Sequence, residues 1–216
     1  LYGLVVTYAP SWINFYALDF SSHILSCFAN APHCGVVLYE DDVEKIDKLF
    51  FMLDNMITER KKLFKGGNYA QYVKANGIVL PMVVVFIDNL GAFREKTDGK
   101  YDDRLTQIMK EGIGYGIQFV VTAAGFTSSE INTKMADSFK TTFALQLNDK
   151  YSYCDALRTN QIEVLPENNV KGRGLAKVNS VILEFQTALA LEAEDDYRRL
   201  EAIDGICETM QKEWEG

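Results

Sequence analysis

The segment VVVFIDNLG, residues 83–91, constrains the fold of this chain more than any other feature. Its first five residues are β-branched or aromatic, a run typical of a buried strand. Pro81 precedes the run and Asp88 ends it, so the strand is predicted to deliver a carboxylate at its C-terminal end. A carboxylate in this place holds Mg²⁺ on a nucleotide in P-loop enzymes. Asp88 is therefore the first candidate site residue.

The residue after Asp88 bears on whether such a site could hydrolyse a nucleotide. ATP-driven motors normally have a glutamate there, which orients or deprotonates the attacking water. Asn89 stands in its place, and its neutral amide cannot take a proton. The pattern predicts an ATPase whose catalytic base is missing. A purely structural role for Asp88 at a strand end is the alternative, because a buried carboxylate needs a partner in either case.

Length and composition indicate one globular α/β domain. The chain has 216 residues, of which 48% are hydrophobic and 24% charged. Its net charge of −8 is spread along the chain, apart from an acidic run over residues 192–196, and no basic stripe is present. Nonspecific nucleic-acid binding is therefore disfavoured. No segment approaches the ~20 apolar residues of a membrane-spanning helix.

Cysteine usage indicates a reducing compartment, and hence the cytosol. The four cysteines form no CxxC pair and no regular framework: Cys27, Cys34, Cys154 and Cys207. Four possible metal ligands lie close together in the sequence, namely His23, Cys27, His33 and Cys34. Their spacing matches no common zinc finger or ribbon, so we expect structural or incidental roles for them.

Alternating helical and strand periods predict a layered α/β fold with a mostly parallel sheet. Strands are predicted at residues 12–20, ending at Asp19, and at 83–88, 117–123 and 142–147. Helices are predicted at residues 43–63, around Tyr69 and Tyr72, and at 102–111, 128–138, 150–158 and 195–214. Residues 172–188 are predicted to form a terminal hairpin. We find no internal repeat and no low-complexity linker.

Local signals refine two of these elements. Asp41 or Asp42 can cap the helix over residues 43–63, and Arg60, Lys61 and Lys62 suit its C-terminal dipole on a solvated face. The segment GIGYG, residues 112–116, superficially resembles a dinucleotide-binding loop. It follows a helix and precedes a strand, the reverse of the order that such a loop needs, so we interpret it as a helix stop.

Several collinear segments together resemble a known family: NFYALDF, NAPHCGVVLYEDDVEKI, LPMVVVFIDNLGAF, EGIGYGIQFVVTA and KGRGLAKVNSVILEFQTAL. The chain resembles the FtsK/SpoIIIE ATPases over nearly its whole length. Within that group it is most similar to a degenerate, C-terminal ATPase module of the type VII secretion coupling proteins (EssC/EccC). The resemblance implies a RecA-like P-loop NTPase fold, with a parallel sheet between helices. It also implies assembly as a ring or chain of modules, with nucleotide at their interfaces.

The resemblance assigns roles to four residues. Asp88 matches the Walker B aspartate, and Asn89 stands where active motors have glutamate. Thr122 lies at the end of the sensor strand, and Ala123 replaces a glutamine that would bond the γ-phosphate or its water. Asp88 and Thr122 are thus expected to bind ATP and Mg²⁺ in the intact protein, with no other metal. Asn89 and Ala123 mark two lost catalytic positions.

The phosphate-binding motif GxxxxGK[ST] does not occur in the sequence. In the family it lies just before the segment that matches Leu1–Pro10, which is therefore expected to end the P-loop helix. We expect residues 1–216 to be one ATPase domain truncated at its N-terminus, with the P-loop strand upstream of Leu1. Such a fragment should bind no cofactor and should not hydrolyse ATP. Its sheet would have an exposed edge, unless the sheet is rearranged or paired between copies.

The function implied is that of a degenerate module with a regulatory or substrate-docking role in protein export. Its partners would be neighbouring ATPase modules and the C-terminal signal of a secreted WXG-type substrate, docked as a helix in a groove. The implied location is the cytoplasmic face of the bacterial membrane, as a soluble part of a membrane-anchored protein.

The alternative function is an active ATP-driven motor for secretion or DNA translocation. Losing a general base costs roughly 10²- to 10⁴-fold in rate, which disfavours this alternative. The acidic composition disfavours DNA as the partner. Four arginines could contribute to a ring interface but are more ordinarily solvated, and none is assigned as an arginine finger: Arg158, Arg173, Arg198 and Arg199.

Overall fold

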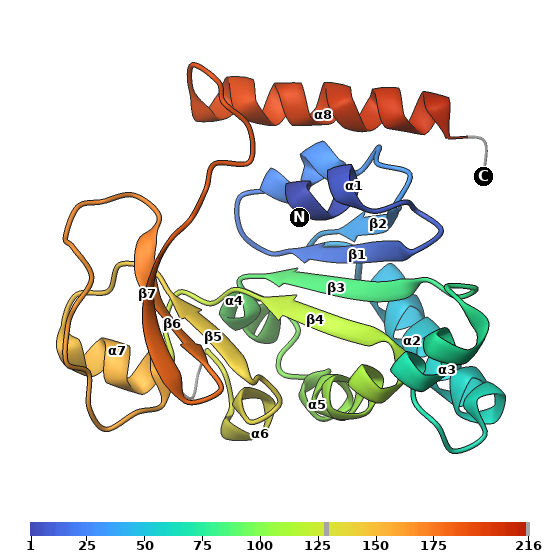
Figure 1. Cartoon of the computed structure of the whole chain (residues 1–216), viewed down its shortest axis with the longest axis horizontal. Coiled ribbons are helices and arrows are strands. Elements are labelled where there is room, and N and C mark those ends of the chain that lie inside the picture. Colours follow the sequence, from blue (N-terminus) through green and yellow to red (C-terminus); the bar gives the residue numbers. More distant parts are fainter. Residues whose placement is uncertain (128–129, 215–216) are drawn as a thin grey trace. The chain divides into compact units, whose positions relative to one another are not determined.

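The computed structural model describes residues 1–127 and 130–214 (Figure 1). The chain forms two compact units. The first comprises residues 1–123 together with 190–216, and the second comprises residues 124–189. The chain therefore leaves the first unit after Ala123 and returns to it at Ala190.

The first unit is built on a four-stranded parallel sheet with the order β2-β1-β3-β4. The strands are β1 (Ile13–Asp19), β2 (Cys34–Leu38), β3 (Met82–Asp88) and β4 (Ile117–Val121). This confirms the predicted α/β class and parallel sheet. Strand β2 was not predicted from the sequence. Strands β1 and β3 are central, and Val83, Val84, Val85 and Ile87 of β3 are buried.

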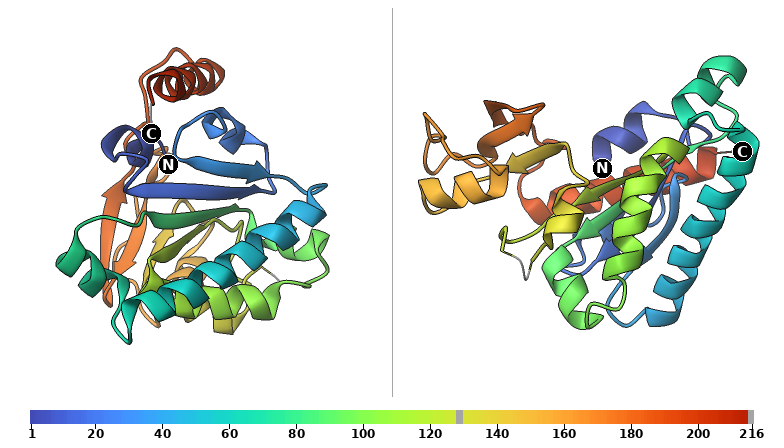
Figure 2. Two further views of the ribbon diagram at one scale, coloured as in Figure 1. Left: turned by 90° about the vertical axis from the view of Figure 1, so that its right-hand side faces the viewer. Right: turned by 90° about the horizontal axis from the view of Figure 1, so that it is seen from below.

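One face of this sheet is covered by α2 (Val43–Phe64), α4 (Leu90–Lys96) and α5 (Asp102–Gly112), with α3 (Tyr69–Asn76) following α2 (Figure 2). Their apolar faces meet through aromatic rings: Phe50 of α2 stacks on Tyr101 with centroids 4.9 Å apart, and Phe93 of α4 lies 5.7 Å from Tyr101. Helix α4 was not predicted. Asp42 lies at the start of α2, but its carboxylate accepts from the amide of Tyr39 and from Lys45 Nζ.

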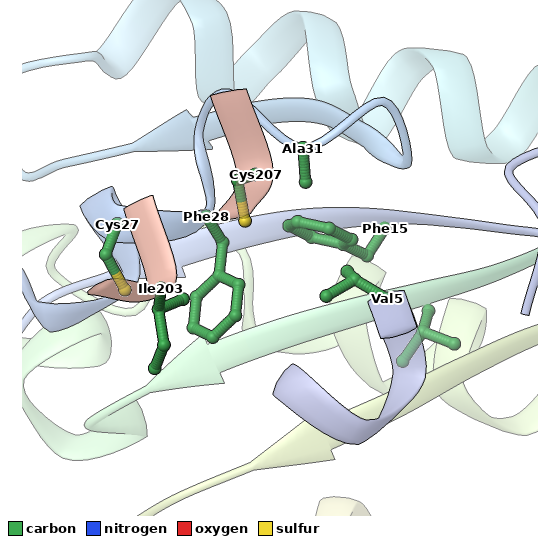
Figure 3. Close-up of a cluster of buried hydrophobic side chains, with 8 residues drawn as sticks. Val5, Phe15, Cys27, Phe28, Ala31, Ile203 and Cys207 are labelled. Carbon is green, nitrogen blue, oxygen red and sulfur yellow. The ribbon is translucent and has the colours of Figure 1, made fainter. Parts of the chain in front are cut away.

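The opposite face carries α1 (Tyr2–Thr7), the short 3₁₀ helix η1 (Ile24–Phe28) and α8 (Asp196–Glu213). Their buried cluster is drawn in Figure 3 and consists of Val5, Phe15, Cys27, Phe28, Ala31, Val84, Ile203 and Cys207. Helix α8 contributes Ile203 and Cys207, while Tyr197 near its start is exposed. The final helix thus completes the core of the first unit.

The second unit has a three-stranded antiparallel sheet, β5-β6-β7. Its elements are α6 (Thr133–Ala136), β5 (Thr141–Ala144), α7 (Lys150–Leu157), β6 (Arg173–Val178) and β7 (Val181–Gln186). The predicted hairpin is confirmed as β6 and β7. The helix predicted at 128–138 is limited to α6 among the described residues, and residues 128 and 129 lie outside them. The strand predicted at 142–147 begins one residue earlier and ends at Ala144.

The expectation that Arg60 lies on a solvated face of its helix is wrong. The residue is only 5% exposed. Its guanidinium donates to the carbonyls of Pro81 and Tyr115, both at 2.6 Å, and lies over the ring of Tyr69. Gly116 has a positive φ of 74°, and a Cβ there would clash with Tyr69 and Arg60. Arg60 thus ties α2 to the start of β3 and β4. Burial lowers the pKa of its guanidinium.

No helix in the described part of the chain has the length and apolar character that crossing a membrane requires.

Candidate functional site

The candidate site lies where β1 and β3 end, side by side in the sheet. Asp19 and Asp88 are the last residues of these strands and are paired in the register. After β1 the chain turns to η1, which packs with α1 and α8, whereas after β3 it enters α4, which packs with α2. Connections that diverge from neighbouring strands mark the point where open α/β sheets bind their ligands. The fold therefore places Asp88 at the edge where such sheets bind ligands.

Asp88 and Thr122 are in direct contact at this edge. The hydroxyl group of Thr122 donates to Asp88 Oδ1 over 2.6 Å. Thr122 Oγ1 also accepts a hydrogen bond from the amide of Asn89 at 2.9 Å. The backbone of Thr122 also bonds to Ile87 and Leu90, each at 2.9 Å. The structure thus brings together the two residues expected to bind nucleotide. Their role as ligands of ATP or Mg²⁺ stays a prediction.

Asn89 caps the helix that follows the strand. Its backbone is left-handed, with φ 63° and ψ 73°, a conformation that asparagine adopts more readily than most residues. Its side-chain oxygen accepts from the amide of Ala92 at 3.1 Å, which satisfies one of the free amides in the first turn of α4. The side chain at the predicted base position is therefore engaged in holding α4.

Ala123 ends the first unit, next to Thr122, and is exposed. Its methyl group can neither donate nor accept a hydrogen bond, so the side chain supplies no polar contact to a ligand at this position.

Asp19 is a residue of the site that the sequence analysis treated only as a strand end. It is fully buried, and its carboxylate accepts three backbone amides: Ser21 and His23 on Oδ1 at 3.3 and 3.2 Å, and Leu25 on Oδ2 at 2.8 Å. The next residue, Phe20, donates its amide to the carbonyl of Asp88 at 3.1 Å. Asp19 therefore fixes the turn beside Asp88. Among the described residues, its hydrogen-bond partners are all backbone amides, so no pair of side chains reveals this role in a sequence pattern.

The rim beyond β2 is polar and partly charged. His23 Nε2 lies 3.4 Å from Glu40 Oε2, and its ring is 4.4 Å from that of Tyr39. A backbone hydrogen bond, and then the contact with His23, lower the pKa of the Glu40 carboxyl group. Burial raises the pKa of Tyr39. This rim leaves Glu40 ionised at neutral pH.

The donor set at this edge fits a metal ion that needs few protein ligands. Among the described residues, no three His, Cys, Asp or Glu side chains are grouped to hold a metal, and this includes the four residues considered for zinc. Mg²⁺ on a nucleotide needs only one or two carboxylates, because phosphates and waters complete its shell. Asp88 has one carboxylate oxygen bonded to Thr122 and a second with no hydrogen bond among the described residues. It fits a cation carried on phosphates, whose charge the cation would neutralise.

The four arginines considered for a ring interface all have acidic partners within their own unit. The pairs are Arg158 with Asp137 at 2.6 Å, Arg173 with Glu184 at 3.3 Å, Arg198 with Glu201 at 2.6 Å, and Arg199 with Asp196. Surface pairs of this kind contribute little to stability. An interface role for these arginines stays a prediction.

Known proteins similar to this chain include proteins of type VII secretion. No family model matches the sequence. A curated relative, the ESX secretion system protein EccC of Thermomonospora curvata, is 28% identical over 226 residues. The alignment covers 99% of this chain and 16% of that protein, so the chain spans about a sixth of the relative's length.

Solved structures extend the similarity to the fold. EssC (ATPases 2 and 3) from Geobacillus thermodenitrificans superposes with a TM-score of 0.84 at 23% identity, covering 98% of this chain and 40% of that one. EccC (ATPases 2 and 3) of Thermomonospora curvata, in complex with a signal sequence peptide, gives 0.79 at 25% identity, covering 100% and 39%. The resemblance inferred from the sequence is confirmed: the chain is similar, over nearly its whole length, to an ATPase module of the EssC/EccC type VII secretion proteins and has their P-loop ATPase fold.

Proposed function

We propose that this chain is a degenerate ATPase module of a type VII secretion coupling protein, with a regulatory or substrate-docking role in protein export. The observation that carries the proposal is that Asn89, at the position of the catalytic base, caps α4 instead. This residue has no proton acceptor of useful basicity, and it uses its side-chain oxygen for the cap. At Ala123 a second polar side chain is absent, the glutamine of the active relatives. Loss of a general base alone costs roughly 10²- to 10⁴-fold in rate.

Nucleotide binding is a separate part of the proposal. Asp88 and Thr122 meet at the carboxyl edge of the sheet, and Asp88 fits a Mg²⁺ ion carried on ATP. No GxxxxGK[ST] loop occurs among the 216 residues, so the phosphates would have to be held by a loop outside this sequence. Strand β4 pairs only with β3 in the described sheet, and its outer edge is where we propose that the missing strand is added.

The proposed partners are neighbouring ATPase modules and the C-terminal signal of a secreted WXG-type substrate. Support comes from the similarity to an EccC structure described as a complex with a signal sequence peptide. A signal of this kind would dock as an amphipathic helix, with apolar anchors at helical spacing. The proposed location is the cytoplasmic face of the membrane, within a membrane-anchored protein. A ring or chain of modules is the proposed assembly.

The competing proposal is an active motor that moves protein or DNA. A net charge of −8 and the absence of a basic stripe in the sequence speak against DNA. Fluorescence anisotropy with labelled ligands separates peptide docking from DNA translocation. We expect the 216-residue chain to bind a substrate C-terminal signal peptide saturably, and to bind neither a scrambled peptide nor duplex DNA. Binding of DNA in preference to the peptide would reject the docking role.

A further inference from the structure

The hydroxyl group of Thr122 has its hydrogen-bond directions fixed by its two neighbours. It accepts from the amide of Asn89, because an N–H group can only donate. Its single proton therefore goes to Asp88 Oδ1, 2.6 Å away. The two contacts use the one donor and one of the two acceptor sites of the hydroxyl group. Thr122 is thus committed to Asp88 as a donor and to Asn89 as an acceptor.

The backbone holds that hydroxyl group in place. The amide of Thr122 donates to the carbonyl of Ile87, and the amide of Leu90 donates to the carbonyl of Thr122, both at 2.9 Å. The backbone of Thr122 is therefore hydrogen-bonded to the residue before Asp88 and to the residue after Asn89. These hydrogen bonds connect the end of β4 to the end of β3. A residue anchored in this way can orient a neighbouring side chain without moving itself.

We propose that Thr122 is a positioning residue for Asp88. Its hydroxyl group holds the carboxylate in one rotamer, with Oδ1 engaged and Oδ2 left for a cation or for water on that cation. This deepens the proposed function and rests on it, because a cation at Asp88 belongs to the proposed nucleotide site. The family resemblance implies a direct contact of Thr122 with the nucleotide. The geometry points instead to an action through Asp88.

Three variants of the 216-residue chain test this role. Thr122→Val removes the hydroxyl group and keeps the branched shape that suits a strand end. Thr122→Ser restores the hydroxyl group. Thr141→Val makes the same change at an exposed strand position of the second unit. Should Thr122→Val fail to fold, Thr122→Ala removes the same hydroxyl group.

The first measurement needs no metal. Three-bond couplings to the Asp88 carboxyl carbon report the χ1 rotamer of that side chain. We expect one dominant rotamer in the parent chain, in Thr122→Ser and in Thr141→Val. In Thr122→Val we expect averaged couplings. The population of the dominant rotamer relative to the others should fall by about three- to tenfold, because one hydrogen bond is lost. A single unchanged rotamer in Thr122→Val would overturn the proposal.

The second measurement uses Mn²⁺ as the probe, followed by paramagnetic broadening of the amide signals of Asp88 and Ala123. We expect Mn²⁺ to bind Thr122→Val about three- to tenfold more weakly than the parent chain, with Thr122→Ser and Thr141→Val within about twofold. Equal affinity in Thr122→Val would overturn the positioning role. Absence of Mn²⁺ binding in every variant would support a cation that binds only together with nucleotide phosphates, and the rotamer measurement would still decide the role of Thr122.

Discussion

The side-chain oxygen of Asn89 accepts a hydrogen bond from the amide of Ala92 over 3.1 Å and so caps α4. The residue at the predicted base position is therefore a structural part of the strand-to-helix turn. Its left-handed backbone places the cap directly after Asp88. Replacing Asn89 by glutamate would change this turn as well as the chemistry of the edge.

Asn89→Glu is therefore expected to destabilise the chain without creating an ATPase. Loss of the cap should lower the free energy of unfolding by about 1 kcal/mol. Asn89→Gly is the matched control, because glycine tolerates the left-handed backbone and costs only about a few tenths of a kcal/mol as a cap. Urea denaturation measures both. An Asn89→Glu chain as stable as the parent would show that the cap contributes nothing.

Asp19→Asn tests the turn beside Asp88. The amide side chain keeps the shape of the carboxylate, but it has only one acceptor oxygen for the amides of Ser21, His23 and Leu25. Hydrogen bonds to a charged group contribute about 1.5–3 kcal/mol, so a loss of about 2 kcal/mol is expected. Hydrogen exchange at Leu25 should accelerate, whereas Asp41→Asn, at an exposed position, should change neither quantity. Unchanged exchange at Leu25 would count against the anchoring role of Asp19.

Arg60→Met tests the buried guanidinium group. The substitution leaves the carbonyls of Pro81 and Tyr115 without their charged donor, partly offset because no charge has to be buried. We expect the free energy of unfolding to fall by about 1–3 kcal/mol. Lys62→Met, two residues along the same helix and highly exposed, should stay within about 0.5 kcal/mol of the parent. Equal urea midpoints for the two variants would show that the buried guanidinium group of Arg60 does not stabilise the fold.

Alkaline pH is expected to weaken the core beneath α8. Burial raises the pKa of Cys27 and Cys207 to about 11 and that of Cys34 to about 12, from a reference value of 9.0. The folded state therefore keeps thiol protons that the unfolded state loses above pH 9. The stability that these thiols contribute is complete below pH 9 and is lost as pH rises through about 11.

Urea denaturation between pH 8 and pH 11 measures this loss. Cys207→Ala removes one of the three thiols, so its stability should decline less steeply with pH than that of the parent chain. Cys154→Ala is the control, because Cys154 belongs to the second unit. Parallel declines in the parent chain and Cys207→Ala would contradict the expected titration.

The sequence was sufficient for the elements with strong periodicity. The apolar run of β3, the stripe of α2 and the β6–β7 hairpin all appear close to their predicted bounds, because burial of one face or of both dictates their composition. The meeting of Asp88 with the end of the sensor strand also follows from the sequence, since parallel strands end at the same edge.

Other features depend on contacts that no sequence pattern records. Strand β2 is only five residues long and includes Gly35, which weakens its strand signal. Helix α4 begins at a left-handed asparagine within what reads as a turn. In the part of the chain that the structure describes, Asp19 bonds only to backbone amides, and Arg60 bonds to carbonyls far away in the sequence. Tertiary structure supplies the partners of Arg60, whereas those of Asp19 lie within six residues of it and depend on the local turn.

The most direct test of the degenerate module is release of radiolabelled phosphate from ATP by the 216-residue chain, compared with Asp88→Ala. A chain with asparagine at the base position and no GxxxxGK[ST] loop in its sequence should release no phosphate above the protein-free blank, and the two chains should be indistinguishable. Phosphate release by the parent chain that Asp88→Ala abolishes would contradict the proposal and identify an active ATPase.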